Sequence, residues 1–350
     1  MSAPPVSVVV TVRDEAASIE ALLASLAAQG HQPDEIVIVD GGSTDATLAI
    51  LAAWEPHLPL RVLVRPGANI SAGRNAGIAL ARGAIVAVTD AGVRLAPDWL
   101  SALLKPFEAD TATQVVGGFF APDPRTPFEL ALGATTLPTR ADVCPETFLP
   151  SSRSVALRRA AWARVGGYPE WLDYCEDLIF DLKLREACGP FAFAPDALAH
   201  FRPRPTLRAF WHQYFRYARG DGKAGLFARR HGIRYATYLG LGAFVARGWR
   251  YPLLWPFVAL AGAGYLRRPY ARLIPALAPL GPAGRARAVA AVPLIRLAGD
   301  LAKCAGYPVG LWWRWRRYGL RRDWRAIEAL ERERRAGGET VQGKCNDASC

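Results

Sequence analysis

Four short apolar segments in the first ninety residues alternate with segments that have helical spacing. The strand-like segments are VSVVVTV (6–12), EIVIVD (35–40), LRVLVRP (60–66) and AIVAVTD (84–90). The intervening residues 18–30, 41–54 and 71–83 are rich in Ala and Leu and predict helices. Strands that are apolar on both faces are typical of a parallel sheet covered by helices on both sides. We therefore predict an α/β fold with a mostly parallel central sheet.

Polar side chains stand where these strands end. In open parallel sheets, ligands bind at the carboxyl ends of the strands, and Asp40 and Asp90 occupy two of those ends. Each could instead be a turn residue that caps its strand. Further along, QVVGGFF (114–120) predicts a strand, and residues 154–168 and 176–189 predict two helices.

The charge of the chain is unevenly distributed. Its 350 residues carry a net charge of +12, and 51% of them are hydrophobic, which indicates a packed protein. Up to Arg234 there are 24 basic and 24 acidic residues, whereas from Tyr235 onward there are 19 basic and 7 acidic residues. We therefore expect a boundary near Tyr235.

The cysteines and the amino terminus indicate a reducing compartment. None of the six cysteines forms a CxxC pair, which argues against a zinc module. The first residues, MSAPPVSVVV, have no basic segment and too short an apolar run for a signal peptide, so we expect a cytoplasmic location. The first strand leads into TVRDEAAS, which has no glycine, so a dinucleotide-binding turn and a phosphate-binding loop are both excluded.

The segments 6–47 and 67–92, which include VDGGSTD, GANISAGRNAG and VTDAG, resemble the inverting family 2 glycosyltransferases of the GT-A fold. The resemblance covers roughly residues 5–225. It implies a GT-A catalytic domain over 1–234, with a nucleotide-binding half at about 1–110 and an acceptor-side half at 111–234. Enzymes of this family use nucleotide-sugar donors, so a nucleotide-diphospho-sugar is the expected partner.

The resemblance also implies donor-binding residues. Asp40 corresponds to the carboxylate that binds the donor nucleoside, and Thr11, Arg13 and Glu15 line the same edge. Arg74 and Asn75 are the expected donor contacts of the GRNAG segment, although a packed Ala/Gly helix with a solvated Arg74 would also explain it. The donor-binding set is Thr11, Arg13, Glu15, Asp40, Arg74, Asn75 and Asp90.

Asp90 corresponds to the first carboxylate of the family's DxD motif, which binds a divalent metal. Here the second acid is replaced by Gly92. A hard cation such as Mg²⁺ or Mn²⁺ prefers oxygen ligands, so we expect Asp90, water and the downstream His200 to complete the site. A single histidine is more often structural than a metal ligand, and that alternative stays open.

Two later segments resemble the family's catalytic and acceptor elements. In YCEDLIF, Asp177 would be the general base and Glu176 would support it. The alternative is an acid-rich helix start, which the helix dipole favours. In QYFRY, Gln213, Arg216 and Tyr217 correspond to the QxxRW element that contacts the acceptor or diphosphate, unless they form an ordinary amphipathic helix.

The basic region 235–335 is expected to associate with a membrane. Its charge-free stretches fall short of the roughly eighteen apolar residues that indicate a span, but Trp and Arg flank them, as at a bilayer interface. A soluble helical appendage is the alternative, and nucleic acid is not an expected partner. Residues 336–350 are predicted to be a disordered tail.

These observations together predict an inverting, metal-assisted glycosyltransferase. It would act on a lipid-linked or polysaccharide acceptor of the cell envelope, at the cytoplasmic face of a bacterial inner membrane. The alternatives are a sugar-nucleotide nucleotidyltransferase, or a catalytically inactive scaffold protein that has lost its metal site.

Overall fold

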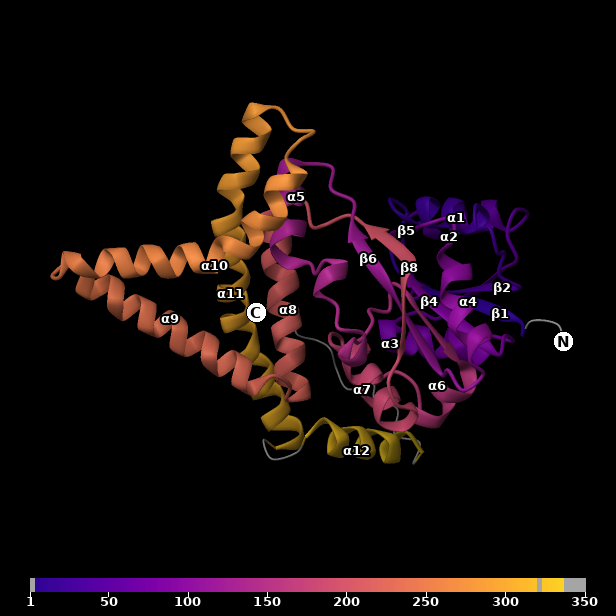
Figure 1. Ribbon diagram of the computed structural model, residues 1–350. Helices are drawn as coiled ribbons and strands as arrows, with labels where there is room; N and C mark the ends of the chain where they lie inside the picture. The colour runs from indigo at the N-terminus through magenta and orange to yellow at the C-terminus, as the bar shows by residue number, and fades with distance from the viewer. Residues whose placement is uncertain (1–3, 320–322, 337–350) are drawn as a thin grey trace.

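The computed structural model describes residues 4–319 and 323–336, and the strands within them form one eight-stranded sheet (Figure 1). The strands are β1 (Val6–Val12), β2 (Glu35–Asp40), β3 (Leu60–Val64), β4 (Ile85–Asp90), β5 (Val93–Leu95), β6 (Val115–Pro122), β7 (Val155–Arg158) and β8 (Ala192–Phe201). Their order across the sheet is β3-β2-β1-β4-β7-β6-β8-β5. The first four are parallel to one another, and β7 and β5 run antiparallel to their neighbours. The predicted α/β fold is confirmed.

Alternate residues of the strands pack into two cores, one on each face of the sheet. Val8 and Val10 of β1 pack with α1 (Ile19–Ala27), α2 (Thr47–Trp54) and α4 (Trp99–Ala109). Val9 points the other way, toward α3 (Ile70–Leu80), α6 (Arg159–Val165) and α7 (Glu176–Cys188). All three valines are completely buried, as expected of a sheet with helices on both faces.

One predicted helix is wrong over its first third. Residues 154–168 were expected to be one helix, but β7 pairs antiparallel with β4, with Val155 opposite Val88, and the helix begins only at Arg159. The helical spacing holds from there to Gly166, which ends α6 in a left-handed conformation. The sheet position between β4 and β6 therefore overrides the local helical preference of VALR.

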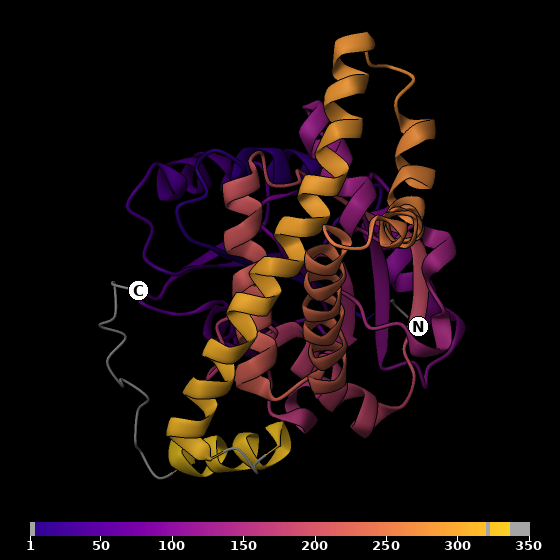
Figure 2. The ribbon, with the colours of Figure 1, turned by 90° about the vertical axis from the view of Figure 1, so that its left-hand side faces the viewer.

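The remaining helices form a second body against one side of the sheet domain (Figures 1 and 2). They are α5 (Pro127–Thr136), α8 (Leu207–Ala224), α9 (Ala228–Gly248), α10 (Trp255–Ala276), α11 (Pro282–Tyr318) and α12 (Trp324–Ala336). Short 3₁₀ turns at Arg140–Asp142 and Pro145–Thr147 lie between α5 and β7, and a third at Pro252–Leu254 links α9 to α10. An apolar cluster joins α5, α8, α10 and α11, so helices from both sides of the predicted boundary share one core. Tyr235 itself lies inside α9.

Helix α11 crosses α8 at very close range. A Cβ atom at Gly306 would lie 2.2 Å from the carbonyl oxygen of Phe215, and one at Gly310 would lie 2.0 Å from that of Arg219. Only glycine permits this approach, which fixes α11 along the whole face of α8. In contrast, α9 and α10 project away from both bodies and meet at a distant tip (Figure 1).

Among the described residues, no helix combines the length and the apolar character that a membrane crossing requires. The predicted tail beyond Ala336 lies outside the described residues.

Candidate active site

A cavity of about 1040 Å³ opens between the end of β4 and the helices α7 and α8. Asp90 enters it from the carboxyl end of β4, Arg74 from α3, and Glu176 and Asp177 from the first turn of α7. The topology therefore brings residues that are about a hundred positions apart to one edge of the sheet. This edge is where an α/β sheet is expected to bind its ligand.

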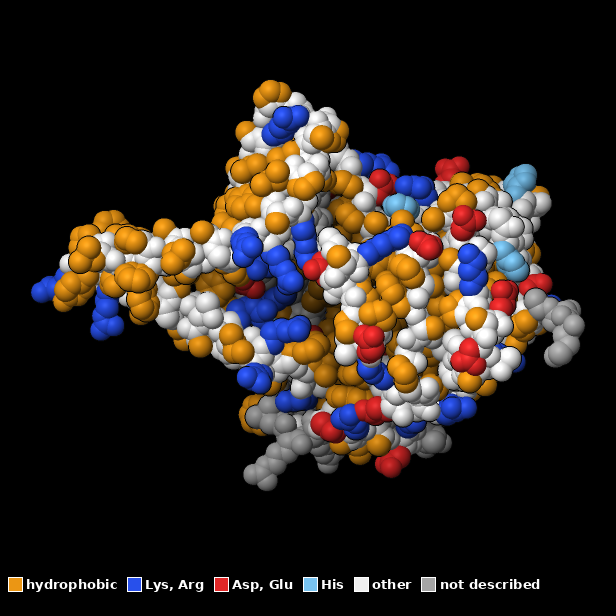
Figure 3. Space-filling view, viewed as in Figure 1, with side chains coloured by type: hydrophobic (Ala, Val, Ile, Leu, Met, Phe, Trp, Pro, Cys, Tyr) orange, Lys and Arg blue, Asp and Glu red, His pale blue; other side chains and the backbone are white. Residues whose placement is uncertain are grey.

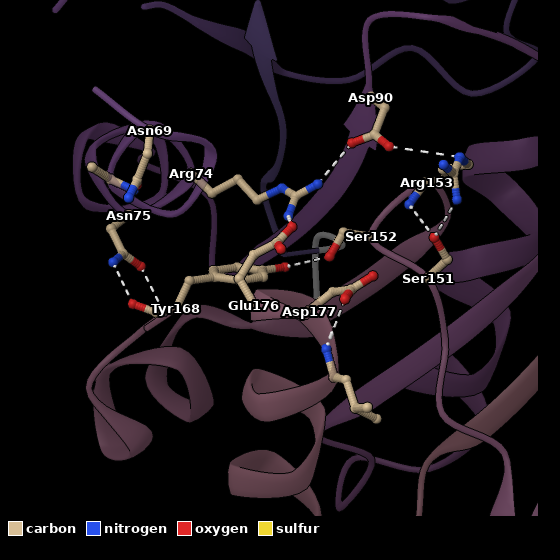
Figure 4. A network of polar contacts seen from close by, with 12 residues as sticks. Asn69, Arg74, Asn75, Asp90, Ser151, Ser152, Arg153, Tyr168, Glu176 and Asp177 are labelled. Atoms are coloured by element: carbon tan, nitrogen blue, oxygen red, sulfur yellow. Dashed lines mark hydrogen bonds and ion pairs between the residues drawn. The ribbon is translucent and has the colours of Figure 1, made fainter. Parts of the chain in front are cut away.

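Arg74 is the central cation of this cavity. Its side chain is almost completely buried, and its two terminal nitrogens donate to Asp90 Oδ1 at 2.7 Å and Glu176 Oε1 at 3.0 Å (Figure 4). Its guanidinium carbon lies 5.2 Å from the ring centroid of Tyr168. Arg74 therefore ties the end of β4 to the start of α7, and the alternative of a solvated arginine is excluded.

Burial and the neighbouring charges shift the pKa values of Asp90 and Glu176 in opposite directions. Burial raises the pKa of Asp90, but Arg74 and Arg153 outweigh it, so the pKa of this carboxyl lies below its usual range. Burial, and then the neighbouring Asp177, raise the pKa of Glu176 to about 7, while Arg74 opposes the shift. Asp90 is therefore a permanent anion, whereas Glu176 titrates near neutral pH.

Asp177 is held at the cavity by the turn that precedes α7. Cys175, just before the helix, has a left-handed backbone with φ of 65°, which is uncommon for a residue with a side chain. Its thiol donates to Asp221 of α8 at 3.2 Å and to the carbonyl oxygen of Tyr217 at 3.4 Å. These contacts fix the turn before α7 to α8 and so position Glu176 and Asp177. A strained backbone conformation persists only where the surrounding structure holds it in this way.

The residues around Asp90 do not fit the predicted divalent cation. Asp90 already faces two guanidiniums, Arg74 at 2.7 Å and Arg153 at 3.7 Å, and Gly92 contributes no side chain. His200 does not line the cavity. It pairs with Arg94 across β8 and β5, and burial and that arginine lower its pKa. No three His, Cys, Asp or Glu side chains cluster as a metal site within the described residues. The countercharge at Asp90 is therefore supplied by arginine.

The predicted nucleoside residues lie beside the cavity and not in its wall. Thr11 is opposite Asp90 in the β1–β4 register, and Arg13 and Glu15 follow at the same end of β1. Asp40 is completely buried, and one carboxylate oxygen accepts from the backbone nitrogens of Gly42 and Ser43 at 2.9 Å each, while Ser43 Oγ donates to the other. Asp40 therefore shapes the turn after β2, as the alternative interpretation of this motif expected.

Asn75 is not brought to the cavity. Its amide nitrogen donates to Tyr168 O at 2.9 Å and to Glu170 Oε1 at 2.8 Å, and its oxygen accepts from Tyr168 N at 2.7 Å (Figure 4). Trp162 Nε1 donates to the same oxygen at 3.1 Å. With all these bonds made, Asn75 fastens α3 to the loop before α7 and has no position free to orient a donor.

The three predicted residues of α8 all line the cavity. Gln213 Nε2 donates to the Tyr217 hydroxyl at 2.7 Å, and Arg216 donates to the Tyr174 hydroxyl at 3.2 Å. Burial raises the pKa of Tyr217, so this hydroxyl stays protonated at neutral pH. They form the wall opposite Arg74 and Asp90.

Three arginine and lysine residues of the cavity were missed by sequence reasoning, namely Arg153, Arg204 and Lys303. Arg153 lies two residues before the start of β7, and because β7 is antiparallel to β4 it emerges at the same edge as Asp90. Recognising the strand at Val155 would have placed it. Lys303 comes from α11, and no local sequence signal could place it.

Comparison with known proteins identifies the front of the chain. Residues 7–151 match the family described as glycosyl transferase family 2. This segment of the chain is similar to a family 2 glycosyltransferase domain. It is similar to the mannosyltransferase PcManGT from Pyrobaculum calidifontis, solved with GDP-Man and Mn²⁺, with 21% identity over 89% of this chain and 87% of that one and a TM-score of 0.52. This likeness shows the GT-A fold.

Curated relatives carry glycosyltransferase names. Validoxylamine A glucosyltransferase of Streptomyces hygroscopicus subsp. limoneus is 30% identical over 129 residues, which are 35% of this chain and 28% of that protein. Succinoglycan biosynthesis protein ExoM of Rhizobium meliloti is 27% identical over 223 residues, which are 59% of this chain and 69% of that protein. The chain spans less than a third of the length of the first of these relatives.

Proposed function

We propose that this chain is an inverting glycosyltransferase that moves a sugar from a nucleotide-diphospho-sugar to an acceptor hydroxyl, with Asp177 as the general base. One observation carries the proposal: Asp177 shares a single cavity with the ion pair of buried Arg74 and partly exposed Asp90 at the carboxyl edge of the sheet. The front half, about 1–110, would bind the donor, and residues 111–234 would face the acceptor.

The reaction needs one base and one countercharge. As the acceptor oxygen attacks the anomeric carbon, its proton passes to the Asp177 carboxylate, and the bond from that carbon to the diphosphate oxygen breaks. The electron pair leaves with the diphosphate, whose negative charge Arg74 and Arg153 stabilise from the cavity wall. A single displacement of this kind inverts the anomeric configuration. Because the residues do not fit a divalent cation, no step runs through one.

The donor's nucleoside would lie along the ends of β1 and β2. Thr11, Arg13 and Glu15 offer polar side chains there, and the turn that Asp40 holds sets the shape of the edge. Gln213, Arg216 and Tyr217 would contact the acceptor or the departing diphosphate from α8.

The acceptor proposed is a lipid-linked or growing envelope glycan at the cytoplasmic face of a bacterial inner membrane. Two observations support it: the similarity to a succinoglycan biosynthesis protein, and the exposed apolar side chains of the helices beyond Ala224. Glycans of this class are assembled on carriers that stay in the bilayer, so the enzyme would work at that surface.

A donor screen tests the proposal. Wild type, Asp177→Asn and Asp90→Asn would be compared with a panel of UDP- and GDP-sugars, measuring both thermal stabilisation and release of free nucleoside diphosphate. We expect one donor class to stabilise wild type and Asp177→Asn alike, with turnover lost in Asp177→Asn. Stabilisation by no donor would favour a non-catalytic scaffold, and unchanged turnover in both variants would overturn the site.

A further inference from the structure

The α9–α10 hairpin (residues 228–276) is the part of the molecule with the most unpartnered apolar side chains. Near its tip, Trp249 and Leu253 are more than four-fifths exposed, and Phe257 and Leu260 are about two-thirds exposed. Figure 3 shows hydrophobic side chains along both arms of this projection, with basic side chains at its end. Contiguous apolar exposure on this scale marks an interaction surface.

The charge of the hairpin is entirely of one sign. From Gly222 to Gly299 the sequence has no Asp or Glu, and the hairpin contains eight arginines. At the tip, Arg247 and Arg250 are exposed, and no acid within the described residues lies at ion-pair distance from either. Such a surface attracts anions and repels a second copy of itself.

The base of the hairpin, in contrast, is firmly attached to the body. His231, which is buried, contacts Asp221 Oδ2 of α8 at 3.0 Å and stacks on Tyr307 of α11 with ring centroids 3.8 Å apart. Arg234 pairs with Asp300 of α11 at 2.9 Å. Because Asp221 also lines the cavity, the hairpin extends from the rim of the proposed active site.

The apolar stretches of the two arms are too short to cross a bilayer. The charge-free stretch of α9, residues 235–246, is about 18 Å long at 1.5 Å per residue, against a hydrocarbon core of about 30 Å. Trp249 and Trp255 meet edge to face at the tip, with ring centroids 6.4 Å apart. Tryptophan beside arginine is typical of a helix that lies in the interface between headgroups and acyl chains.

We propose that the α9–α10 hairpin docks in the interface of a membrane rich in anionic lipids. The apolar side chains insert among the acyl chains, and Arg247 and Arg250 bind headgroup phosphates. The cavity rim is thereby held against the surface that carries the acceptor. This docking rests on the membrane location proposed above, but not on the chemistry at Asp177, so it is tested without any turnover.

Co-sedimentation of the full chain with vesicles tests the proposal. Vesicles of phosphatidylglycerol and phosphatidylcholine would be compared with pure phosphatidylcholine, and we expect clear binding to the first and weak binding to the second. Arg247→Glu/Arg250→Glu should weaken partitioning into the anionic vesicles at least about tenfold. The matched control is Lys105→Glu/Arg159→Glu, which makes the same charge change at exposed sites on α4 and α6 and should bind like wild type.

A second variant separates insertion from simple charge attraction. Trp249→Ser/Leu253→Ser/Phe257→Ser should lose vesicle binding, whereas Val64→Ser, at an exposed site on β3, should not. Thermal unfolding of every variant verifies that it is folded. The proposal is overturned if Arg247→Glu/Arg250→Glu and its control Lys105→Glu/Arg159→Glu bind anionic vesicles equally. It is also overturned if a folded wild type binds no vesicles. A stable dimer that hides the hairpin and ignores vesicles would also overturn it.

Discussion

The cavity and the α9–α10 hairpin use the same residue types in opposite ways. In the cavity, Arg74 is buried, both of its terminal nitrogens meet carboxylates, and an aromatic ring lies beside it. At the hairpin tip, Arg247 and Arg250 are exposed next to aromatic rings and meet no acid among the described residues. Paired charges fix geometry, which chemistry needs, whereas unpaired charges remain available to a partner.

The largest expected effect is a loss of activity that only changes in the cavity should cause. Asp177→Asn keeps the shape of the side chain but cannot accept the acceptor's proton, so kcat should fall by about 10²–10⁴-fold. The measurement is the initial rate with the donor found in the screen. Asp196→Asn, at a carboxylate whose side chain is 79% exposed, should leave the rate unchanged, and an equal loss in both would contradict the assignment.

The next effect is on stability, which should depend on the paired arginine of the cavity and not on an arginine of the hairpin tip. Arg74→Met leaves the carboxylates of partly exposed Asp90 and buried Glu176 without their cation, and we expect a loss of about 3 kcal/mol in the free energy of unfolding. Arg247→Met, at the exposed tip, should change it by less than about 0.5 kcal/mol. Urea denaturation of both variants measures this.

Neutralising the acids tests the cause of that loss. Adding Asp90→Asn and Glu176→Gln to Arg74→Met should recover most of the stability, because no unpaired charge is then buried. If the triple variant is as unstable as the single one, Arg74 acts through packing and not through charge.

A smaller effect concerns the countercharge. Arg153→Gln should raise KM for the donor about tenfold, the size expected for one lost charge-assisted hydrogen bond.

Chelation by EDTA should change the wild-type rate less than about twofold, because Asp90 is already matched by two arginines. Loss of activity in EDTA with recovery on Mn²⁺ would show instead that a cation completes the site.

The last effect is a pH dependence of stability. Native Glu176 holds its proton up to about pH 7, whereas in the unfolded chain it loses it near its ordinary value of 4.5. Between these values the native state binds more protons, so stability should fall as the pH rises, by at most about 1.4 kcal/mol per pH unit, and level off above 7. Glu176→Gln should remove this decline. Parallel curves for both proteins, from denaturation at several pH values, would exclude Glu176 as its source.

The sequence predicted most of the sheet because its strands are apolar on both faces and the segments between them have helical spacing. It also predicted the residues that carry charge at strand and helix ends, namely Asp90, Glu176 and Asp177. It failed where tertiary pairing decided the outcome: β7 was taken for helix, and Arg153 was missed for the same reason. Asn75 was predicted to bind the donor because a sequence motif identifies candidate functional positions but does not show the direction of each side chain.

The most direct test of the account is the anomeric configuration of the first product, followed by ¹H NMR during wild-type turnover. Direct displacement with Asp177 as the base predicts a product whose configuration is inverted relative to the donor. A product that retains the donor's configuration would contradict it, because retention requires a second displacement for which the account assigns no nucleophile.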